Sequence, residues 1–188
     1  MFKLLDDIWG KVLAGLMGIA AIYVTLIMFA IVYTSGFRYL GFSYSPLTIP
    51  FIEYGFIYIL FLGSPFLVRM RGHVYIEMLT AALGDFQRLI VSRLICLLAG
   101  GVCLTWAWYT GLLFLERYED IMAYDELRAQ WDIPLWISTL PFPIGFFLMS
   151  IEFFRFVFIA EPMHTGLAGI ASDRIELEET KRDLEGLS

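Results

Sequence analysis

The chain has 188 residues, of which 59% are hydrophobic, and its mean hydropathy of +0.72 excludes a soluble globular domain of this size. The net charge of −6 comes from residues in the connections and ends, and the 13 Lys and Arg residues are scattered, so nothing supports nucleic-acid binding. The apolar residues form long blocks with few charges, and such blocks predict membrane spans.

The sequence therefore predicts an all-α integral membrane protein with four transmembrane helices inside a membrane domain at 1–160. The four spans are expected at about residues 12–33, 51–68, 89–115 and 133–159. The first block is too long for the core of a signal peptide, and we predict that it is a retained span. Ala14, Gly18 and Ala21 recur in it at helical spacing, which would let another helix approach closely.

Between the second and third blocks, polar residues recur every three or four positions. They form one stripe: His73, Glu77, Thr80, Gly84 and Arg88. Apolar residues occupy the opposite face, so we predict an amphipathic surface helix at about residues 73–88, lying along the membrane. The polar residues 161–188 predict a cytoplasmic tail.

The third and fourth blocks contain cysteines, prolines and one possible ion pair. Cys96 and Cys103 are separated by about 10 Å along a helix axis, too far for a disulfide, and we interpret them as small apolar fillers. Pro141 and Pro143 are expected to bend the fourth span. Glu152 and Arg155 are three residues apart, and a pair on one helix face is predicted.

The positions of Lys and Arg predict the orientation. Ten of the 13 lie at the amino end, between the second and third spans, or in the tail counted from Arg155. Because cytoplasmic segments carry the excess of Lys and Arg, both termini are expected inside.

No pattern in the sequence points to an enzyme. The two histidines, His73 and His164, lie outside the predicted spans, where axial haem ligands would be needed, and no Cys-x-x-Cys pair or metal-ligand spacing is present. Catalytic, metal-binding and substrate-binding residues are therefore not predicted.

The ionisable residues near the spans are the candidates for contacts with a partner or with lipid. They are Glu53, Arg69, Arg71, His73, Glu77, Glu152 and Arg155. Arg69 and Arg71 most simply fix the topology and touch lipid phosphates. Glu53 is either an interfacial carboxylate that reaches water or a contact with a neighbouring helix or subunit.

One stretch of sequence has a recognisable pattern. Glu53 opens the second span, Leu62-Gly63 follows, and Arg69 precedes Arg71-Gly72-His73-Val74-Tyr75-Ile76-Glu77-Met78-Leu79; later, Pro141 and Pro143 precede Gly145 in the fourth span. This resembles the DctQ-like small membrane subunit of tripartite ATP-independent periplasmic (TRAP) transporters. Val74, Tyr75 and Glu77 differ from the residues most common at those positions of the family.

The resemblance implies a role in a complex of the bacterial inner membrane. A periplasmic binding protein would capture an organic acid, and a large subunit of many spans would carry it inward, coupled to sodium. This chain would be the fixed scaffold for the large subunit, without a cofactor of its own and with the sodium sites on the large subunit. The acidic connection from Glu116 to Asp132 would help to seat the binding protein.

Two alternatives of other classes remain open from the sequence. One is a free-standing scaffold of four spans, and the other is a quinone- or lipid-linked subunit of a membrane enzyme.

Overall fold

The computed structural model describes residues 2–43, 45, 47–70, 85–120 and 133–159. The helices in these ranges are α1 (Phe2–Tyr39), α2 (Thr48–Arg69), α4 (Asp85–Glu119), α5 (Leu135–Thr139) and α6 (Pro141–Phe158). Four spans among them are long and apolar enough to cross a membrane, with α5 and α6 together forming the last.

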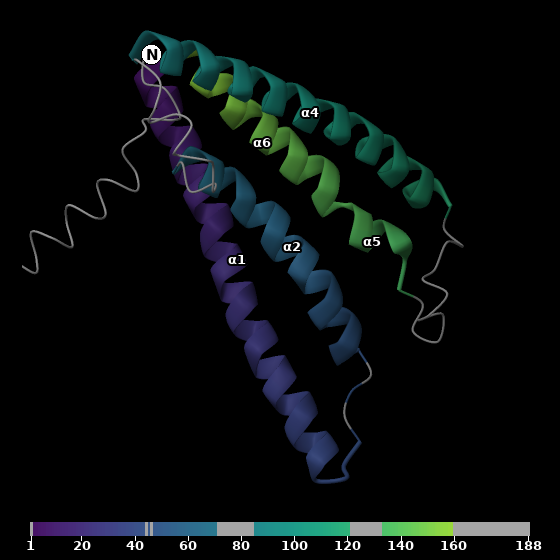
Figure 1. Cartoon of the computed structure of the whole chain (residues 1–188). Helices are drawn as coiled ribbons and strands as arrows, with labels where there is room; N and C mark the ends of the chain where they lie inside the picture. Colours follow the sequence, from purple (N-terminus) through teal and green to yellow (C-terminus); the bar gives the residue numbers. More distant parts are fainter. Residues whose placement is uncertain (1, 44, 46, 71–84, 121–132, 160–188) are drawn as a thin grey trace, which may run out of the picture.

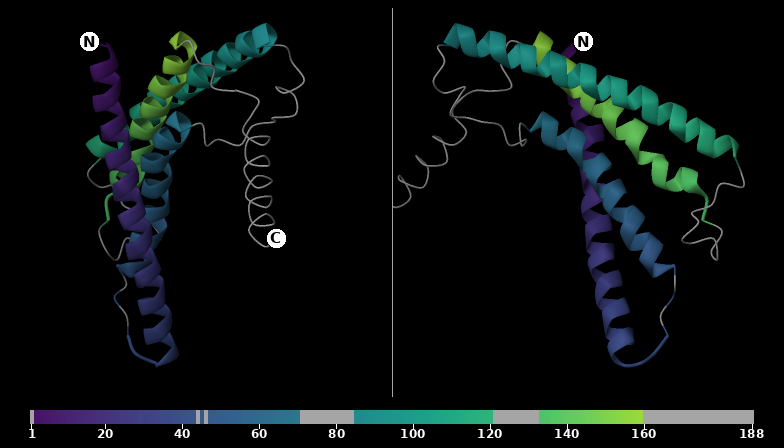
Figure 2. Two further views of the ribbon diagram at one scale, coloured as in Figure 1. Left: turned by 90° about the vertical axis from the view of Figure 1, so that its left-hand side faces the viewer. Right: turned by 45° about the vertical axis from the view of Figure 1, so that its right-hand side comes forward.

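The helices are arranged as two pairs. Figure 1 shows α1 packed along α2, and α4 packed along α5 and α6. The pairs meet where α2 contacts α6; they converge towards the start of α1 and diverge towards its other end, as the views in Figure 2 also show. Polar side chains of α1, α2 and α6 gather at the end where the pairs converge.

α1 is much longer than a bilayer requires. Its 38 residues extend about 57 Å, against a hydrocarbon core of about 30 Å. It ends in a Schellman motif, because Gly41 has a φ of 74° and the Phe42 N–H donates to the Phe37 carbonyl over 2.9 Å. The Phe37 and Phe42 rings, 6.2 Å apart, supply the apolar contact typical of that motif.

The packing between α2 and α6 depends on a glycine. Phe61 of α2 packs on Phe142 and Phe146, with ring centroids 4.7 and 5.0 Å away. A Cβ atom at Gly145 would lie 2.5 Å from the Phe61 ring and 2.9 Å from the Phe61 carbonyl oxygen. The absence of a side chain at Gly145 therefore allows α6 to approach the backbone of α2.

The fourth span is interrupted at Leu140, as its prolines predicted. Pro141 has no N–H, so the carbonyl of Ile137, four residues earlier, loses its usual helical donor. The Tyr58 hydroxyl of α2 donates to this carbonyl over 2.7 Å. A contact between the two helix pairs thus satisfies the backbone group that the proline leaves unpaired.

The outer surface suits lipid. Large apolar side chains such as Ile22, Phe29, Leu60, Leu98 and Phe147 are well exposed on the helices. Four threonine hydroxyls donate hydrogen bonds to backbone carbonyls of the preceding turn of their own helix. They belong to Thr25, Thr34, Thr105 and Thr110. This arrangement satisfies polar groups within each helix, as a hydrocarbon solvent requires.

The predicted spans at 12–33, 51–68, 89–115 and 133–159 each correspond to a helical span, but their limits differ. α1 includes residues 2–11, which precede the predicted span, and α2 begins at Thr48, three residues before the predicted start. Residues 85–88, which we predicted to end the surface helix, instead begin α4. The polar stripe and the third span have the same helical period, so the sequence does not mark where the surface helix would end and the span begin. The rest of the predicted surface helix, residues 73–84, lies outside the described residues.

Candidate functional site: a network of buried charges

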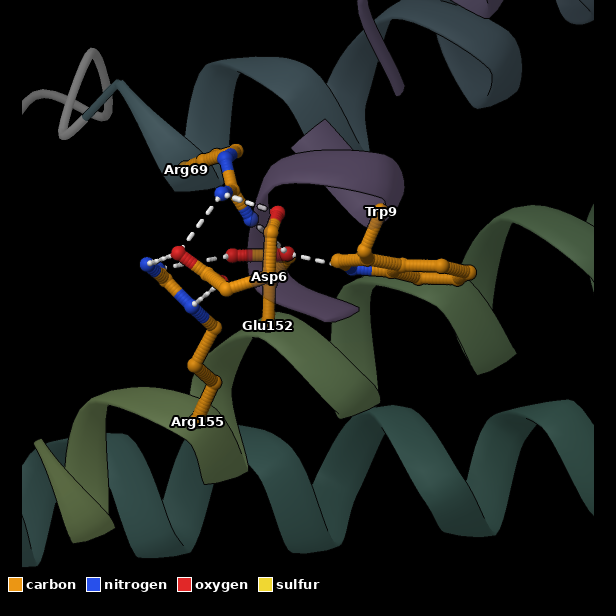
Figure 3. A network of polar contacts seen from close by, with 5 residues as sticks. All are labelled: Asp6, Trp9, Arg69, Glu152 and Arg155. Atoms are coloured by element: carbon orange, nitrogen blue, oxygen red, sulfur yellow. Dashed lines mark hydrogen bonds and ion pairs between the residues drawn. The ribbon is translucent and has the colours of Figure 1, made fainter. Parts of the chain in front are cut away.

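Five side chains from three helices meet at the convergent end of the molecule. Figure 3 shows Asp6 and Trp9 of α1, Arg69 of α2, and Glu152 and Arg155 of α6 pointing toward one another. We call this set the charge network. Arg69 is the last residue of α2, while Glu152 and Arg155 lie in the final part of α6, so the network ties three helix ends together.

Glu152 is at the centre of the charge network. Its side chain is fully buried, and both of its carboxylate oxygens accept hydrogen bonds. Oε1 accepts from the indole N–H of Trp9 over 2.6 Å and from Nη1 of Arg69 over 3.1 Å. Oε2 accepts from Nη1 of Arg155 over 3.4 Å. One carboxylate therefore joins α1, α2 and α6.

Asp6 is the second carboxylate and bridges the two arginines. Its Oδ1 and Oδ2 accept from Nε and Nη2 of Arg155 over 2.6 and 3.0 Å, a bidentate pair. Its Oδ2 also lies 3.1 Å from Nη2 of Arg69, which donates to the Asp6 backbone carbonyl over 3.0 Å. Asp6 keeps 37% of its side-chain exposure, so it is the water-facing side of the charge network.

The formal charges of the charge network cancel, since two arginines face two carboxylates. An unpaired charge at the centre of a span costs about 3 kcal/mol on insertion scales, and a buried ion that loses its partner costs about 3–5 kcal/mol. No buried side-chain nitrogen or oxygen in the described part of the chain lacks a hydrogen-bond partner. The arrangement is suited to hold helices together.

A glycine makes room for the Arg69 guanidinium. A Cβ atom at Gly10 would lie 2.9 Å from Nη2 and 3.2 Å from Cζ of Arg69. Gly10 directly follows Trp9, so the same turn of α1 supplies a hydrogen-bond donor to Glu152 and the open surface that admits Arg69.

Three of the seven residues singled out in the sequence meet here. The predicted pair between Glu152 and Arg155 is present at 3.4 Å. Arg69, which we assigned to topology and lipid phosphates, has carboxylate partners on α1 and α6 and is only 15% exposed. Glu53 lies apart from them, exposed near the opposite end of α2.

The other candidates, Arg71, His73 and Glu77, lie outside the described residues. Within the described ranges, no group of three or more His, Cys, Asp and Glu residues could hold a metal ion. Cys96 is buried in the apolar core with Phe61, Val68 and Met149, and both cysteines are free thiols.

Sequence reasoning missed Asp6 and Trp9. We started the first span at residue 12 and treated the preceding residues as a polar lead. Asp6, Trp9, Leu13 and Ala20 nevertheless follow the three- and four-residue steps of one helix face, and Leu13 and Ala20 are buried. Extending that face toward the N-terminus would have placed both residues on the packed side of α1.

Comparison with known proteins gives one match. The chain matches the family DctQ, described as "Tripartite ATP-independent periplasmic transporters, DctQ component", over residues 24–160. Arg69, Glu152 and Arg155 lie inside this range, whereas Asp6 and Trp9 precede it. Neither the curated proteins nor the solved structures gave a significant match. With four apolar helical spans and a family match over most of its length, this chain is a multi-pass membrane protein that belongs to the DctQ family, the small permease component of TRAP transporters.

Proposed function

We propose that this chain is the fixed scaffold of a TRAP transporter and supports a large subunit that carries an organic acid inward with sodium. The observation that carries the proposal is the charge network: its two carboxylates are held by two arginines and join three helix ends. A carboxylate that carried sodium or a proton would have to change partners during transport. A scaffold needs the opposite, a set of contacts that stays closed.

The exposed face of α1 supplies a surface for the large subunit. Ala14, Gly18 and Ala21 are all exposed, and a Cβ atom at Gly18 would have no neighbour within 4 Å. Leu13, Ala20 and Ile27 occupy a different face of the helix, which is buried. Small residues on a lipid-facing helix allow close approach of another helix, so a helix of the large subunit is the partner that suits this face.

The distribution of Lys and Arg supports the orientation in this proposal. With ten of the 13 on one side, both termini and the charge network lie at the cytoplasmic face of the bacterial inner membrane. The connection that begins at Glu116 then faces the periplasm, where it would help to seat the substrate-binding protein. Sodium binds the large subunit in this account, and the chain carries no cofactor.

Reconstituted transport tests the proposal. Liposomes would contain this chain, the large permease, or both, with the binding protein and its labelled organic acid outside and an inward sodium gradient. Uptake is expected only when both membrane chains and sodium are present. Uptake by this chain alone, or uptake by the complex without a sodium gradient, would contradict the proposal.

A crosslink tests whether the chain stays fixed. After replacement of Cys96 and Cys103 by alanine, a Gly18→Cys variant would be joined to a cysteine on the large subunit. Because the joint does not move in a scaffold, the crosslinked complex is expected to keep its uptake rate. A crosslink that stops uptake while the reduced complex still works would show that this interface moves during transport.

A further inference from the structure

A groove of about 530 Å³ lies in the wedge between α2, α4 and the fourth span. Both helix pairs contribute to its walls, since Ile57 comes from α2, Leu113 from α4, and Phe142 and Phe146 from α6. Its volume is within the range of about 300–1,000 Å³ typical of small-molecule sites. The charge network lies at the opposite, convergent end of the helices and does not contribute to it.

The wall of the groove includes hydroxyl groups, and three of them donate their protons to backbone carbonyls rather than to the groove. Thr110 donates to the Trp106 carbonyl over 2.6 Å, and Ser138 donates to the Leu135 carbonyl over 2.8 Å. Thr139 likewise donates to a carbonyl of its own helix, over 3.1 Å. Because the protons of these three hydroxyls are used within their own helices, this part of the wall suits hydrocarbon.

Arg117 gives the groove one positively charged end. Residues 94–115 of α4 carry no charged side chain and extend about 33 Å, close to the thickness of the hydrocarbon core of about 30 Å. Arg117 therefore lies at the headgroup level. The rings of Phe114, Tyr118 and Trp136 form a cluster next to it in the sequence, with centroids 5.8–6.5 Å apart, as expected of an interfacial aromatic belt.

The groove has the length of one membrane leaflet. Trp106, which lines its other end, lies near the middle of the uncharged stretch and about 16 Å from Arg117 along the helix axis. That distance is about half of the hydrocarbon core. A single acyl chain is much narrower than a helix of about 10 Å in diameter and can lie lengthwise in a groove of this volume.

We propose that this groove binds a glycerophospholipid of the leaflet on the Arg117 side, with an acyl chain along the groove and the phosphate on Arg117. The guanidinium suits a phosphodiester because its fork of N–H groups matches two phosphate oxygens. Within the described residues, no ion pair engages Arg117. A bound lipid would fill the wedge between the two helix pairs at the end where the charge network does not join them.

Photochemical labelling tests this site directly. The full chain would be placed in phosphatidylcholine nanodiscs that contain a small fraction of phosphatidylglycerol with a diazirine on one acyl chain, and adducts would be mapped by mass spectrometry. Adducts are expected on Ile57, Leu113, Phe142 and Phe146. Arg117→Gln is expected to reduce them severalfold, and Leu113→Trp, which fills the groove, is expected to abolish them while Arg117 remains.

Arg38→Gln is the matched control. Arg38 is exposed in the last turn of α1, at the same end of the molecule, and does not line the groove. It is expected to leave the groove adducts unchanged. Equal labelling in the Arg117→Gln and Arg38→Gln proteins would overturn the proposal, as would adducts confined to outward-facing residues such as Ile22 and Phe29. Loss of groove adducts on assembly with the large permease would show that protein occupies the groove, and would overturn it too.

Discussion

The buried carboxylate of Glu152 is stable because its neighbours donate hydrogen bonds to it. A fully buried carboxylate in a membrane helix is costly, and here it accepts three hydrogen bonds, two of them from guanidinium groups. The arginines need the carboxylates in return, because most of each arginine side chain is buried. At the level of single residues, these charges are therefore stable only together.

Glu152→Gln should therefore be strongly destabilising. The amide can still accept hydrogen bonds, but two arginines would then share one carboxylate. We expect a loss of about 3 kcal/mol, near the lower limit for breaking a buried pair, because the arginines keep some exposure. Unfolding by SDS titration in mixed micelles measures it. Glu116→Gln, the same change at an exposed residue of α4, should change stability little, and equal losses for both variants would contradict the account.

Asp6 and Asp7 form a natural matched pair. Asp6 bridges two arginines, whereas its neighbour Asp7 is exposed. Asp6→Asn should cost about 1 kcal/mol, a modest figure because the side chain is partly exposed and water screens the pair. Asp7→Asn should be close to neutral in the same titration. If the two variants are equally stable, Asp6 of α1 does not contribute to stability through the charge network.

At the scale of elements, close approach between helices depends on glycines at particular positions. Gly145→Ala should destabilise the protein by about 1–3 kcal/mol, since its Cβ would meet the Phe61 carbonyl, a backbone atom that cannot rotate away. Gly101→Ala, where no atom lies within 4 Å of the added carbon, should be neutral or stabilising by up to about 1 kcal/mol. Thermal unfolding of both variants in detergent tests the contrast, and an unaffected Gly145→Ala protein would contradict the packing.

The hydrogen bond from Tyr58 to the Ile137 carbonyl can be tested with and without Pro141, which leaves that carbonyl unpaired. Tyr58→Phe removes the donor to the Ile137 carbonyl and should cost about 1–3 kcal/mol, the usual effect of an unpaired buried polar group. In a Pro141→Ala background, the new backbone N–H can reach that carbonyl, so the same change should cost clearly less. A double-mutant cycle by SDS titration measures the difference. Equal losses in both backgrounds would show that the hydroxyl does not compensate for the proline.

The sequence predicted the elements better than their contacts. Long uncharged blocks identified four spans because a bilayer requires about 20 apolar residues in each. The Glu152–Arg155 pair was predictable because its partners are one helical turn apart. Arg69 and Asp6 are 63 residues apart, and no local spacing relates them. Trp9 and Asp6 also lay outside the block that composition marked as a span, so their place on the packed face was missed.

At the scale of the whole molecule, two helix pairs are joined at one end by paired charges and left apart at the other. The joined end suits the proposed scaffold role, in which the helices would keep their relative positions while a partner moves. The divergent end contains the groove with Arg117, which we assign to lipid. Many large apolar side chains are exposed on the outward surface, so a partner in the membrane competes with lipid for it.

Affinity capture shows whether this chain is a component of a larger transporter. The tagged chain would be taken from its native membrane in mild detergent, and the bound proteins would be identified and quantified by mass spectrometry. We expect equimolar recovery of a large, many-span permease, and loss of that partner when Gly18 is replaced by Trp on the exposed face of α1. Recovery of the chain alone, or only with further copies of itself, would contradict it.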